Sequence, residues 1–360
     1  MKWSYTIGRI AGTDIKVHVT FLLLVAFWAL AGYQQAGTRG AISAAVMLLA
    51  LFGCVLLHEF GHILMARRFG VRTPDVILLP IGGVARLERI PSEPKQELLI
   101  ALAGPAVTLA IVVVLYLVLL ASGARPTLGQ LEPDSDFLTF LMRVNVFLLL
   151  FNLIPAFPMD GGRVLRALLA SRLGMVRGTR LAATLGQILA VIGGFYGLTA
   201  NEPLLALVAL FVFLGAGSEA SAVETRAAGE GLRVGQMMVT NFRTVPVYAS
   251  LGDAVDLLLT GEQRDFPVVD NLGHTEGILT RDNLIRGLSQ RGAGSGVAES
   301  MTPRAPAVPP TLGFEEALER LRSSGLPALP VVDATGRLVG LLTLDNITDL
   351  LLVHRARSAS

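Results

Sequence analysis

An apolar stretch at residues 41–66 is long enough to cross a membrane, and it contains the sequence HEFGH at residues 58–62. On a helix, the side chains of His58 and His62 leave the same face, so both imidazoles can reach one Zn²⁺ ion while Glu59 lies beside them. Two histidines and a glutamate are costly in lipid unless they have partners and a function. The chain is therefore expected to fold around a polar site inside a membrane domain.

Most of the apolar sequence lies before residue 220. Charged residues make up 16% of the chain, whereas a soluble domain usually has about 25%. We expect about six helical spans, at residues 17–33, 41–66, 97–122, 137–157, 181–198 and 203–219. The last two are short and are separated only by residues 199–202, so they can form a helical hairpin.

Lysine and arginine are unevenly distributed among the segments that join the spans. They gather at the N-terminus, after the second span and after the fourth, whereas the opposite loops contain only Arg39 and Arg125. Because positively charged loops stay in the cytoplasm, the sequence predicts a multi-pass protein of the cell membrane with both termini in the cytoplasm. The net charge of +2 is too small to indicate nucleic-acid binding, and one cysteine excludes an intrachain disulfide.

A second polar segment, NLIPAFPMDGG at residues 152–162, follows the fourth span. Catalytic zinc usually has three protein ligands and one open position, and HEFGH supplies two of them. Asp160 is the best candidate for the third. Two prolines break the helix and two glycines permit a tight turn, so Asp160 is expected on a rigid bend rather than on a helix face. The alternative is a membrane-exit turn with a solvated aspartate.

An internal repeat occupies the C-terminal part. The sequence PVVD occurs at residues 267–270 and again at 330–333, an offset of 63 residues that several other positions share. Each copy is predicted to contain a short strand, an amphipathic helix, two strands and a final helix. The expected organisation is an α-helical polytopic membrane domain at 1–220, a linker or short helix at 221–233, and an α/β tandem domain at 234–354 with copies at about 234–290 and 297–353.

HEFGH in one span and NLIPAFPMDGG in a later one, in this order, resemble the site-2 protease family of intramembrane zinc metalloproteases. The resemblance covers about residues 40–220. The repeat resembles a pair of cystathionine-β-synthase (CBS) domains, which one branch of that protease family carries.

The resemblance implies an endopeptidase with one Zn²⁺ per chain, held by His58, His62 and Asp160, with Glu59 as the general base. It implies a substrate that is a membrane-spanning regulatory protein, cleaved near the cytoplasmic face after its helix unwinds. It also places Asn152 near the site, where it can help to position substrate, although an asparagine in a span can equally join helices.

The segment after the HEFGH helix resembles the family's glycine-containing loop. Gly82 and Gly83 lie in this segment, which is expected to form a short hairpin that dips toward the site and pairs with an unwound substrate by strand addition. The alternative is an ordinary cytoplasmic turn.

CBS pairs commonly bind adenine nucleotides, so the resemblance implies a nucleotide between the copies. The residues at the matching positions are Thr280 and Asn283 in one copy and Thr343 and Asn346 in the other. The family pattern has aspartate where Asn283 and Asn346 stand, and asparagine has fewer acceptor sites for ribose hydroxyls. The alternative is a module that forms a homodimer without ligand.

Two other kinds of membrane protein are alternatives to the protease. A CBS-regulated transporter predicts no HExxH and no third ligand, and a catalytically silent scaffold predicts no need for intact site residues. The sequence therefore favours the protease, with the lipid bilayer and a membrane-spanning substrate as its partners.

Overall fold

A computed structural model describes residues 3–80, 82–86, 93–124 and 136–358. The chain divides into two compact units, Met1–Val223 and Glu224–Ser360. Each unit has its own architecture.

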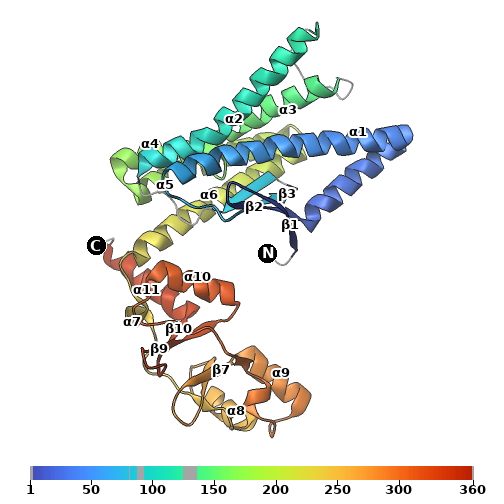
Figure 1. The fold of residues 1–360 in the computed structure, drawn as a ribbon. Coiled ribbons are helices and arrows are strands. Elements are labelled where there is room, and N and C mark those ends of the chain that lie inside the picture. The colour runs from blue at the N-terminus through green and yellow to red at the C-terminus, as the bar shows by residue number, and fades with distance from the viewer. Residues whose placement is uncertain (1–2, 81, 87–92, 125–135, 359–360) are drawn as a thin grey trace. The chain divides into compact units, whose positions relative to one another are not determined.

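Helix α1 (Val19–Arg68) is a hairpin of two arms rather than one rod (Figure 1). The backbone leaves the helical conformation at residues 36–37, where the chain reverses. The rings of Phe21 on the first arm and Phe52 on the second lie 4.5 Å apart, edge to face. The two arms occupy the places of the first two predicted spans.

Five further helices follow in the described part of this unit. They are α2 (Pro94–Ala121), α3 (Phe137–Asn152), α4 (Asp160–Leu173), α5 (Met175–Thr199) and α6 (Pro203–Gly229). Among the described residues, four helices are long and apolar enough to cross a membrane, namely α1, α2, α5 and α6, and α3 is a shorter apolar helix. The apolar helices coincide with the six predicted segments, and the number of crossings stays a prediction.

Two predicted boundaries differ from the structure. Helix α3 ends at Asn152, not at residue 157, because Pro155 and Pro158 lack the backbone N–H that a helix needs. Helix α6 runs on to Gly229, so the first part of the predicted linker at 221–233 is helical.

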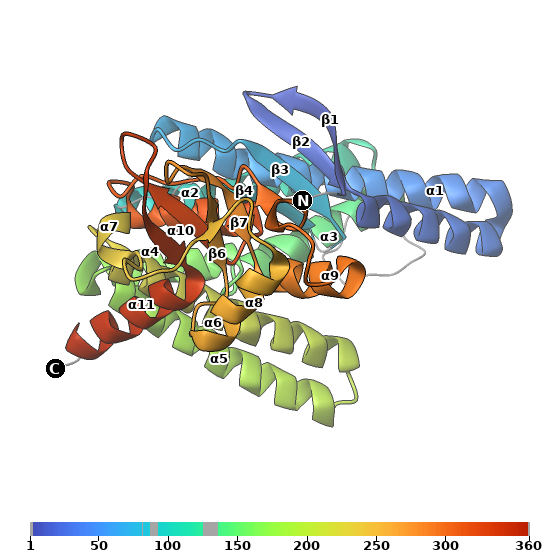
Figure 2. The same cartoon turned by 90° about the horizontal axis from the view of Figure 1, so that it is seen from below.

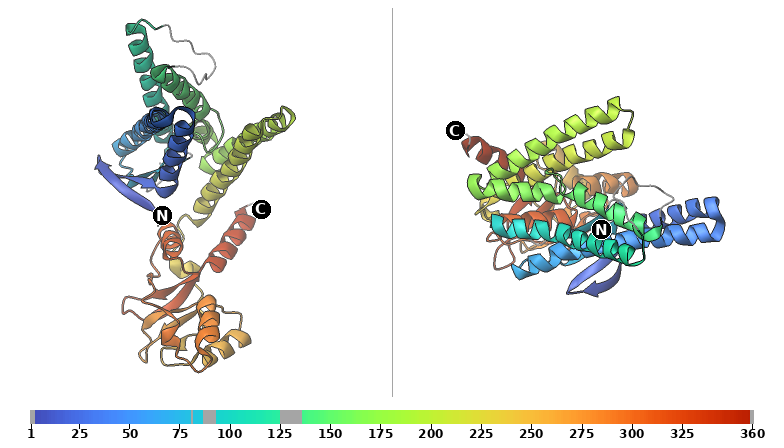
Figure 3. Two further views of the ribbon diagram at one scale, coloured as in Figure 1. Left: turned by 90° about the vertical axis from the view of Figure 1, so that its right-hand side faces the viewer. Right: turned by 90° about the horizontal axis from the view of Figure 1, so that it is seen from above.

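A four-stranded sheet packs beside the second arm of α1. Its strands lie in the order β1 (Ser4–Ile10), β2 (Thr13–His18), β3 (Asp75–Leu79) and β4 (Gly82–Arg86). Only the β2–β3 pair is parallel. Ile15 and Val76 on the inner face pack against Ile63 of α1, one residue after the HEFGH sequence. The sheet and the α5–α6 hairpin lie on opposite sides of the remaining helices (Figure 2; Figure 3, right).

The second unit contains the predicted repeat. Its elements are α7 (Val234–Met237), β5 (Val245–Pro246), α8 (Leu251–Thr260), β6 (Phe266–Val269), β7 (Thr275–Leu279), α9 (Arg281–Arg291), the 3₁₀ helix η1 (Val297–Glu299), β8 (Thr302–Pro303), α10 (Phe314–Ser324), β9 (Ala328–Val332), β10 (Leu338–Thr343) and α11 (Leu344–Ser358). The order of helix and strand matches the prediction, except that the short strand predicted near residues 308–309 is a single bridge between Val308 and Val331.

The two copies exchange strands. Thr302, at the start of the second copy, pairs with Ile278 of the first, and Val239, at the start of the first copy, pairs with Leu341 of the second. Each copy therefore completes the sheet of the other, and the pair forms one folding unit.

Candidate metal centre

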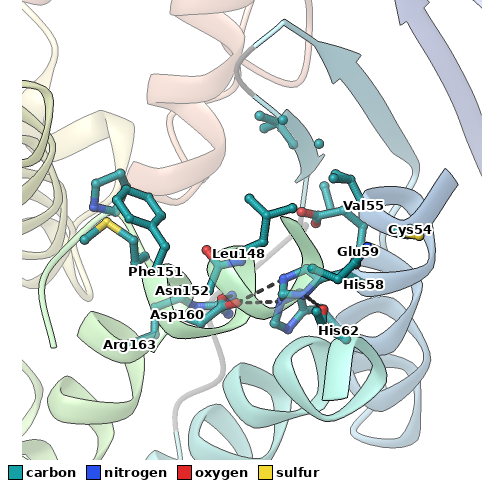
Figure 4. A pocket seen from close by; sticks show the side chains of 18 of the residues that line it. Cys54, Val55, His58, Glu59, His62, Leu148, Phe151, Asn152, Asp160 and Arg163 are labelled. Carbon is teal, nitrogen blue, oxygen red and sulfur yellow. Dashed lines mark hydrogen bonds and ion pairs between the residues drawn. The ribbon is translucent and has the colours of Figure 1, made fainter. Parts of the chain in front are cut away.

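Three buried side chains converge at the second arm of α1. The Nε2 atoms of His58 and His62 lie 3.1 Å apart, and the Oδ2 atom of Asp160 lies 3.2 Å from the first and 3.1 Å from the second (Figure 4). Their residues are 7%, 5% and 8% exposed, respectively. The helical spacing of HEFGH thus brings both imidazoles to one point, and α4 brings the carboxylate to the same point.

The hydrogen bonds of the two rings fix which nitrogen carries the proton. The Nδ1 atom of His62 lies 2.7 Å from the carbonyl oxygen of Ile100, which can only accept, so Nδ1 must donate. The Nδ1 atom of His58 lies 2.9 Å from the Oγ1 atom of Thr108, whose own hydroxyl donates to the carbonyl of Gly104. Both neutral rings therefore have their lone pair on Nε2, the nitrogen that faces the cluster.

A lone pair on each Nε2 atom and a carboxylate oxygen cannot satisfy one another. All three are acceptors in this state, so none of them can donate a hydrogen bond to another. A cation at their centre satisfies all three at once. Two imidazoles and one carboxylate form a donor set typical of catalytic zinc, with a fourth position left open. The residues present therefore fit a zinc ion.

Helix α2 orients both imidazole rings. It supplies the two acceptors, Ile100 and Thr108, and between them Gly104 leaves the space that the rings occupy. A Cβ atom added at Gly104 would lie 2.2 Å from the Nε2 atom of His62 and 2.8 Å from that of His58. Any side chain at this position would enter the cluster itself.

Asp160 is not on a bend, contrary to the sequence-based expectation. It is the first residue of α4, because the two glycines after it are helical. A Cβ atom at Gly161 would lie 2.3 Å from the carbonyl oxygen of Ile154, and one at Gly162 would lie 2.5 Å from the carbonyl carbon of Ala156. The glycines therefore let the first turn of α4 pack directly on the chain that precedes it. The Nη1 atom of Arg163 lies 3.6 Å from the other oxygen of Asp160.

Glu59 lines a cavity of about 440 Å³ together with the three candidate ligands. Gly82 and Gly83 of strand β4 and Asn152 at the end of α3 line the same cavity. Gly83 approaches the glutamate so closely that an added Cβ atom would lie 2.7 Å from its Cγ atom.

The glycine segment forms the predicted hairpin. β3 and β4 pair antiparallel, with Leu79 opposite Gly82, and β4 is the last strand on its side of the described sheet. The structure thus brings every predicted residue of the protease site to one cavity.

The four residues predicted to contact a nucleotide lie in two clefts of the CBS unit rather than in one. Thr280 and Asn283 line one cleft, and Thr343 and Asn346 line the other. Each threonine hydroxyl accepts a hydrogen bond from the backbone N–H of the asparagine in its own copy, at 3.2 and 3.1 Å.

The side-chain amides of these asparagines donate hydrogen bonds to other residues of the CBS unit. Asn283 donates to the hydroxyl of Thr302 at 3.2 Å, and Asn346 donates to the carbonyl of Met237. An aspartate could not replace Asn346, because a carboxylate cannot donate to the carbonyl of Met237. The asparagines therefore join the strand-exchanged parts of the two copies.

Comparison with known proteins gives two family matches. Residues 46–134 and 128–193 match the model of peptidase family M50, and residues 234–290 and 297–353 match the CBS domain. A zinc metalloprotease of Methanocaldococcus jannaschii is 37% identical over 75% of this chain and 76% of its own length. A protein of Mycobacterium tuberculosis that is named as a zinc metalloprotease, Rip3, is 31% identical over 99% of this chain and 94% of its own.

The chain belongs to peptidase family M50. It is therefore a metalloprotease with membrane-spanning helices, followed by a CBS pair, and family membership separates it from the transporter alternative. Among solved structures, the site-2 protease from Methanocaldococcus jannaschii is 38% identical, covers 61% of this chain and 95% of its own, and has a TM-score of 0.46.

Three further residues beside the site of this M50 peptidase are not evident from its sequence. Thr108 orients His58, while Arg163 and Asn145 line the cavity. Thr108 and Asn145 are polar residues within apolar spans, and Arg163 directly follows the two glycines. Polarity inside a span is a signal of function or of helix packing, and only the structure separates the two.

Proposed function

We propose that this M50 peptidase is an intramembrane zinc endopeptidase in which His58, His62 and Asp160 bind the metal and Glu59 is the general base. The observation that carries the proposal is the convergence of two Nε2 lone pairs and one carboxylate oxygen within 3.2 Å. The M50 family match and the zinc metalloproteases among its relatives agree with this donor set.

The chemistry divides between the metal and the chain. A bound zinc ion would lower the pKa of a coordinated water and polarise the scissile carbonyl. Glu59 takes a proton from the attacking water and delivers it to the leaving amine. Thr108 and Ile100 keep the two imidazoles in the tautomer that leaves Nε2 free. The surrounding cavity gives water access to a site that lies among apolar helices.

The substrate is proposed to be a membrane-spanning regulatory protein that is cleaved near the cytoplasmic face. The carbonyls of a substrate helix are already hydrogen-bonded, so the helix must unwind before attack. Among the described residues, no strand pairs with the outer edge of β4 beside Glu59, and we propose that an extended substrate segment adds there as a further strand. Asn152, which lines the same cavity at the end of α3, is proposed to hydrogen-bond that segment.

The orientation is also a proposal. The distribution of lysine and arginine places both termini and the CBS pair in the cytoplasm. Reporter fusions at the N-terminus, after residue 123 and at the C-terminus test this. A reporter that is active only in the cytoplasm should work at both termini and fail at the internal position.

The CBS unit is proposed to bind an adenine nucleotide. Support comes from the two clefts, which share Arg264 and Arg281 and contain a conformationally fixed threonine hydroxyl each. Calorimetric titration of the full chain with AMP and ATP tests it, with Arg264→Ala as the variant. Heat that is reduced in the variant supports the proposal, and no heat from the parent with either nucleotide would remove it.

Zinc content with X-ray absorption tests the metal site. The purified full chain should hold about one zinc, with nitrogen ligands at about 2.0–2.1 Å and oxygen at about 2.0–2.2 Å. His58→Ala and Asp160→Asn should lower the zinc content. His18→Ala and Asp136→Asn, which alter a histidine and an aspartate at other helix starts, should not. Equal zinc in all five proteins would contradict the assignment.

A further inference from the structure

A buried ion triad joins three helices of the M50 unit. Arg166 of α4 donates from Nε to the Oε1 atom of Glu97 on α2 at 2.7 Å, and its Nη2 atom contacts the same oxygen. Its Nη1 atom contacts the Oε1 atom of Glu219 on α6. The side chains of Arg166 and Glu97 are 2% and 0% exposed, whereas that of Glu219 is 34% exposed.

This triad is not accounted for by the proposed chemistry. Removing charges from water is expensive, and a buried ion pair often stabilises a protein less than an apolar pair of the same size would. Among the described residues, the second carboxylate oxygen of Glu97 has no hydrogen-bond partner although it is buried. The charge of Glu97 therefore relies on Arg166, and the triad needs a role other than stability.

Its position relative to the metal ligands indicates that role. Helix α2 sets both imidazoles through Ile100 and Thr108, and Glu97 lies one helical turn before Ile100. Helix α4 carries Asp160 at its first residue, and Arg166 lies six residues later. The Glu97–Arg166 pair therefore fixes the helix that bears the third ligand against the helix that orients the first two.

Arg166 also holds the chain that leads into Asp160. Its guanidinium carbon lies 5.0 Å from the centre of the Phe157 ring, and Phe157 is 1% exposed. The rigid, planar fork of an arginine can contact two carboxylates and an aromatic face at once, which the single charge of a lysine cannot do.

We propose that Arg166 is a positioning residue for Asp160, and that Glu219 makes this positioning depend on α6, the helix that leads out of the membrane unit. The inference rests on the proposed metal site. Loss of Arg166 lets α4 move relative to α2, so the two imidazoles stay in place while the carboxylate shifts from the metal. Loss of the Glu219 charge weakens the same restraint from the α6 side.

Cobalt and zinc binding by the full chain in detergent test the proposal without relying on activity. The variants are Arg166→Met, Arg166→Lys and Glu219→Gln, with Arg172→Met, an exposed arginine of the same helix, as the control. Zinc affinity, measured by competition with a chelator, should fall about 10–100-fold in Arg166→Met and less in the other two. Arg172→Met should bind as the parent does.

The absorption spectrum of bound Co²⁺ separates positioning from a merely structural role, because it depends on the coordination geometry. Asp160→Asn, in which the two histidines remain, provides the reference spectrum. The Arg166→Met spectrum should move from that of the parent toward that of Asp160→Asn. If Arg166→Met does not fold, Arg166→Lys and Glu219→Gln should show smaller shifts in the same direction.

Two results would overturn the inference, and they differ. If the parent binds metal and the variants have its affinity and its Co²⁺ spectrum, Arg166 does not position Asp160, and the proposed function stands. If the parent binds neither metal, the metal site fails and the inference fails with it.

Discussion

The Nε2 atoms of His58 and His62 lie 3.1 Å apart, and in neither neutral ring does this nitrogen carry the proton. Each ring donates its proton from Nδ1, to Thr108 in one case and to the carbonyl of Ile100 in the other. Two lone pairs therefore face each other beside the carboxylate of Asp160. Both acceptors lie on helix α2. This helix therefore sets the orientation of the two rings, although it carries none of the candidate ligands.

Thr108→Val is expected to weaken zinc binding about 10-fold, because the Nδ1 proton of His58 loses its acceptor and the ring loses its fixed tautomer. Thr108→Ser keeps the hydroxyl and should bind zinc nearly as the parent does. Thr184→Val is the matched control, since Thr184 is exposed and its hydroxyl donates to the carbonyl of Arg180 in the same helix. Chelator competition measures all four affinities, and equal values for Thr108→Val and Thr184→Val would contradict the role of Thr108.

Gly104→Ala is expected to abolish zinc binding. The added methyl group would lie 2.2 Å from the Nε2 atom of His62, so the two imidazoles would have to leave Ile100 and Thr108, the residues that orient them. Gly193→Ala, on α5, has no atom within 4 Å of the added group and should bind zinc normally. Metal analysis of both purified variants provides the measurement, and normal zinc content in Gly104→Ala would show that α2 lies farther from the histidines.

Gly83→Ala should separate binding from catalysis. Its methyl group would press on the Cγ atom of Glu59, 2.7 Å away, and the three atoms nearest to it all belong to Glu59. We expect normal zinc content and cleavage that is reduced by up to about 100-fold, since a small displacement of a catalytic group can cost that much. Gly8→Ala on β1, where nothing lies within 4 Å, is the control. Unchanged cleavage in Gly83→Ala would exclude close contact between β4 and Glu59.

The sheet that presents β4 should lose stability in acid. Asp75 of β3 is 1% exposed and binds Lys16 of β2 at 2.6 Å and the Nε atom of Arg86 of β4 at 2.6 Å. These two cations lower the pKa of Asp75 to about 2, below its ordinary value. A lowered pKa stabilises the fold above about pH 4, and this stabilisation disappears as the pH falls from about 4 to about 2.

Asp75→Asn should therefore lower the thermal stability of the detergent-solubilised chain at pH 7, by on the order of 1 kcal/mol, because solvent screens the exposed Arg86. It should also flatten the dependence of stability on pH below pH 4. Asp14→Asn, which alters an exposed ion pair with Arg9, is the control. Melting temperatures at pH 3, 5 and 7 test this, and parallel curves for Asp75→Asn and the parent would refute it.

The sequence was sufficient for the residues whose position depends on local periodicity. His58, Glu59 and His62 follow from helical spacing, and the CBS copies follow from a 63-residue offset that the strand pairing repeats. Asp160 follows from the need of catalytic zinc for a third ligand. Its position on the first turn of α4 does not follow from the sequence. Two glycines suggest a turn in sequence, and only packing against residues 153–157 shows why they are helical here.

The contacts made by α2 could not be predicted in the same way. The carbonyl of Ile100 has no signature in the sequence, because every residue has one, and its role depends on the angle between two helices. The β1–β2 hairpin could have been predicted, because residues 4–7 of β1 and 14–18 of β2 alternate polar and apolar side chains. In the triad, Arg166 lies 69 positions from Glu97 and 53 positions from Glu219 in the sequence. The periodicity of a single sequence does not detect contacts over such separations.

Cleavage of a single-span substrate panel in detergent tests the central proposal most directly, with parent and Glu59→Gln compared at equal zinc content. The account predicts that both proteins hold about one zinc and that only the parent cleaves, because the glutamine cannot accept the proton of the attacking water. Cleavage by Glu59→Gln at the rate of the parent would contradict it. So would a parent that holds zinc and cleaves no member of a panel that an M50 relative cleaves, which would leave a membrane scaffold as the remaining function.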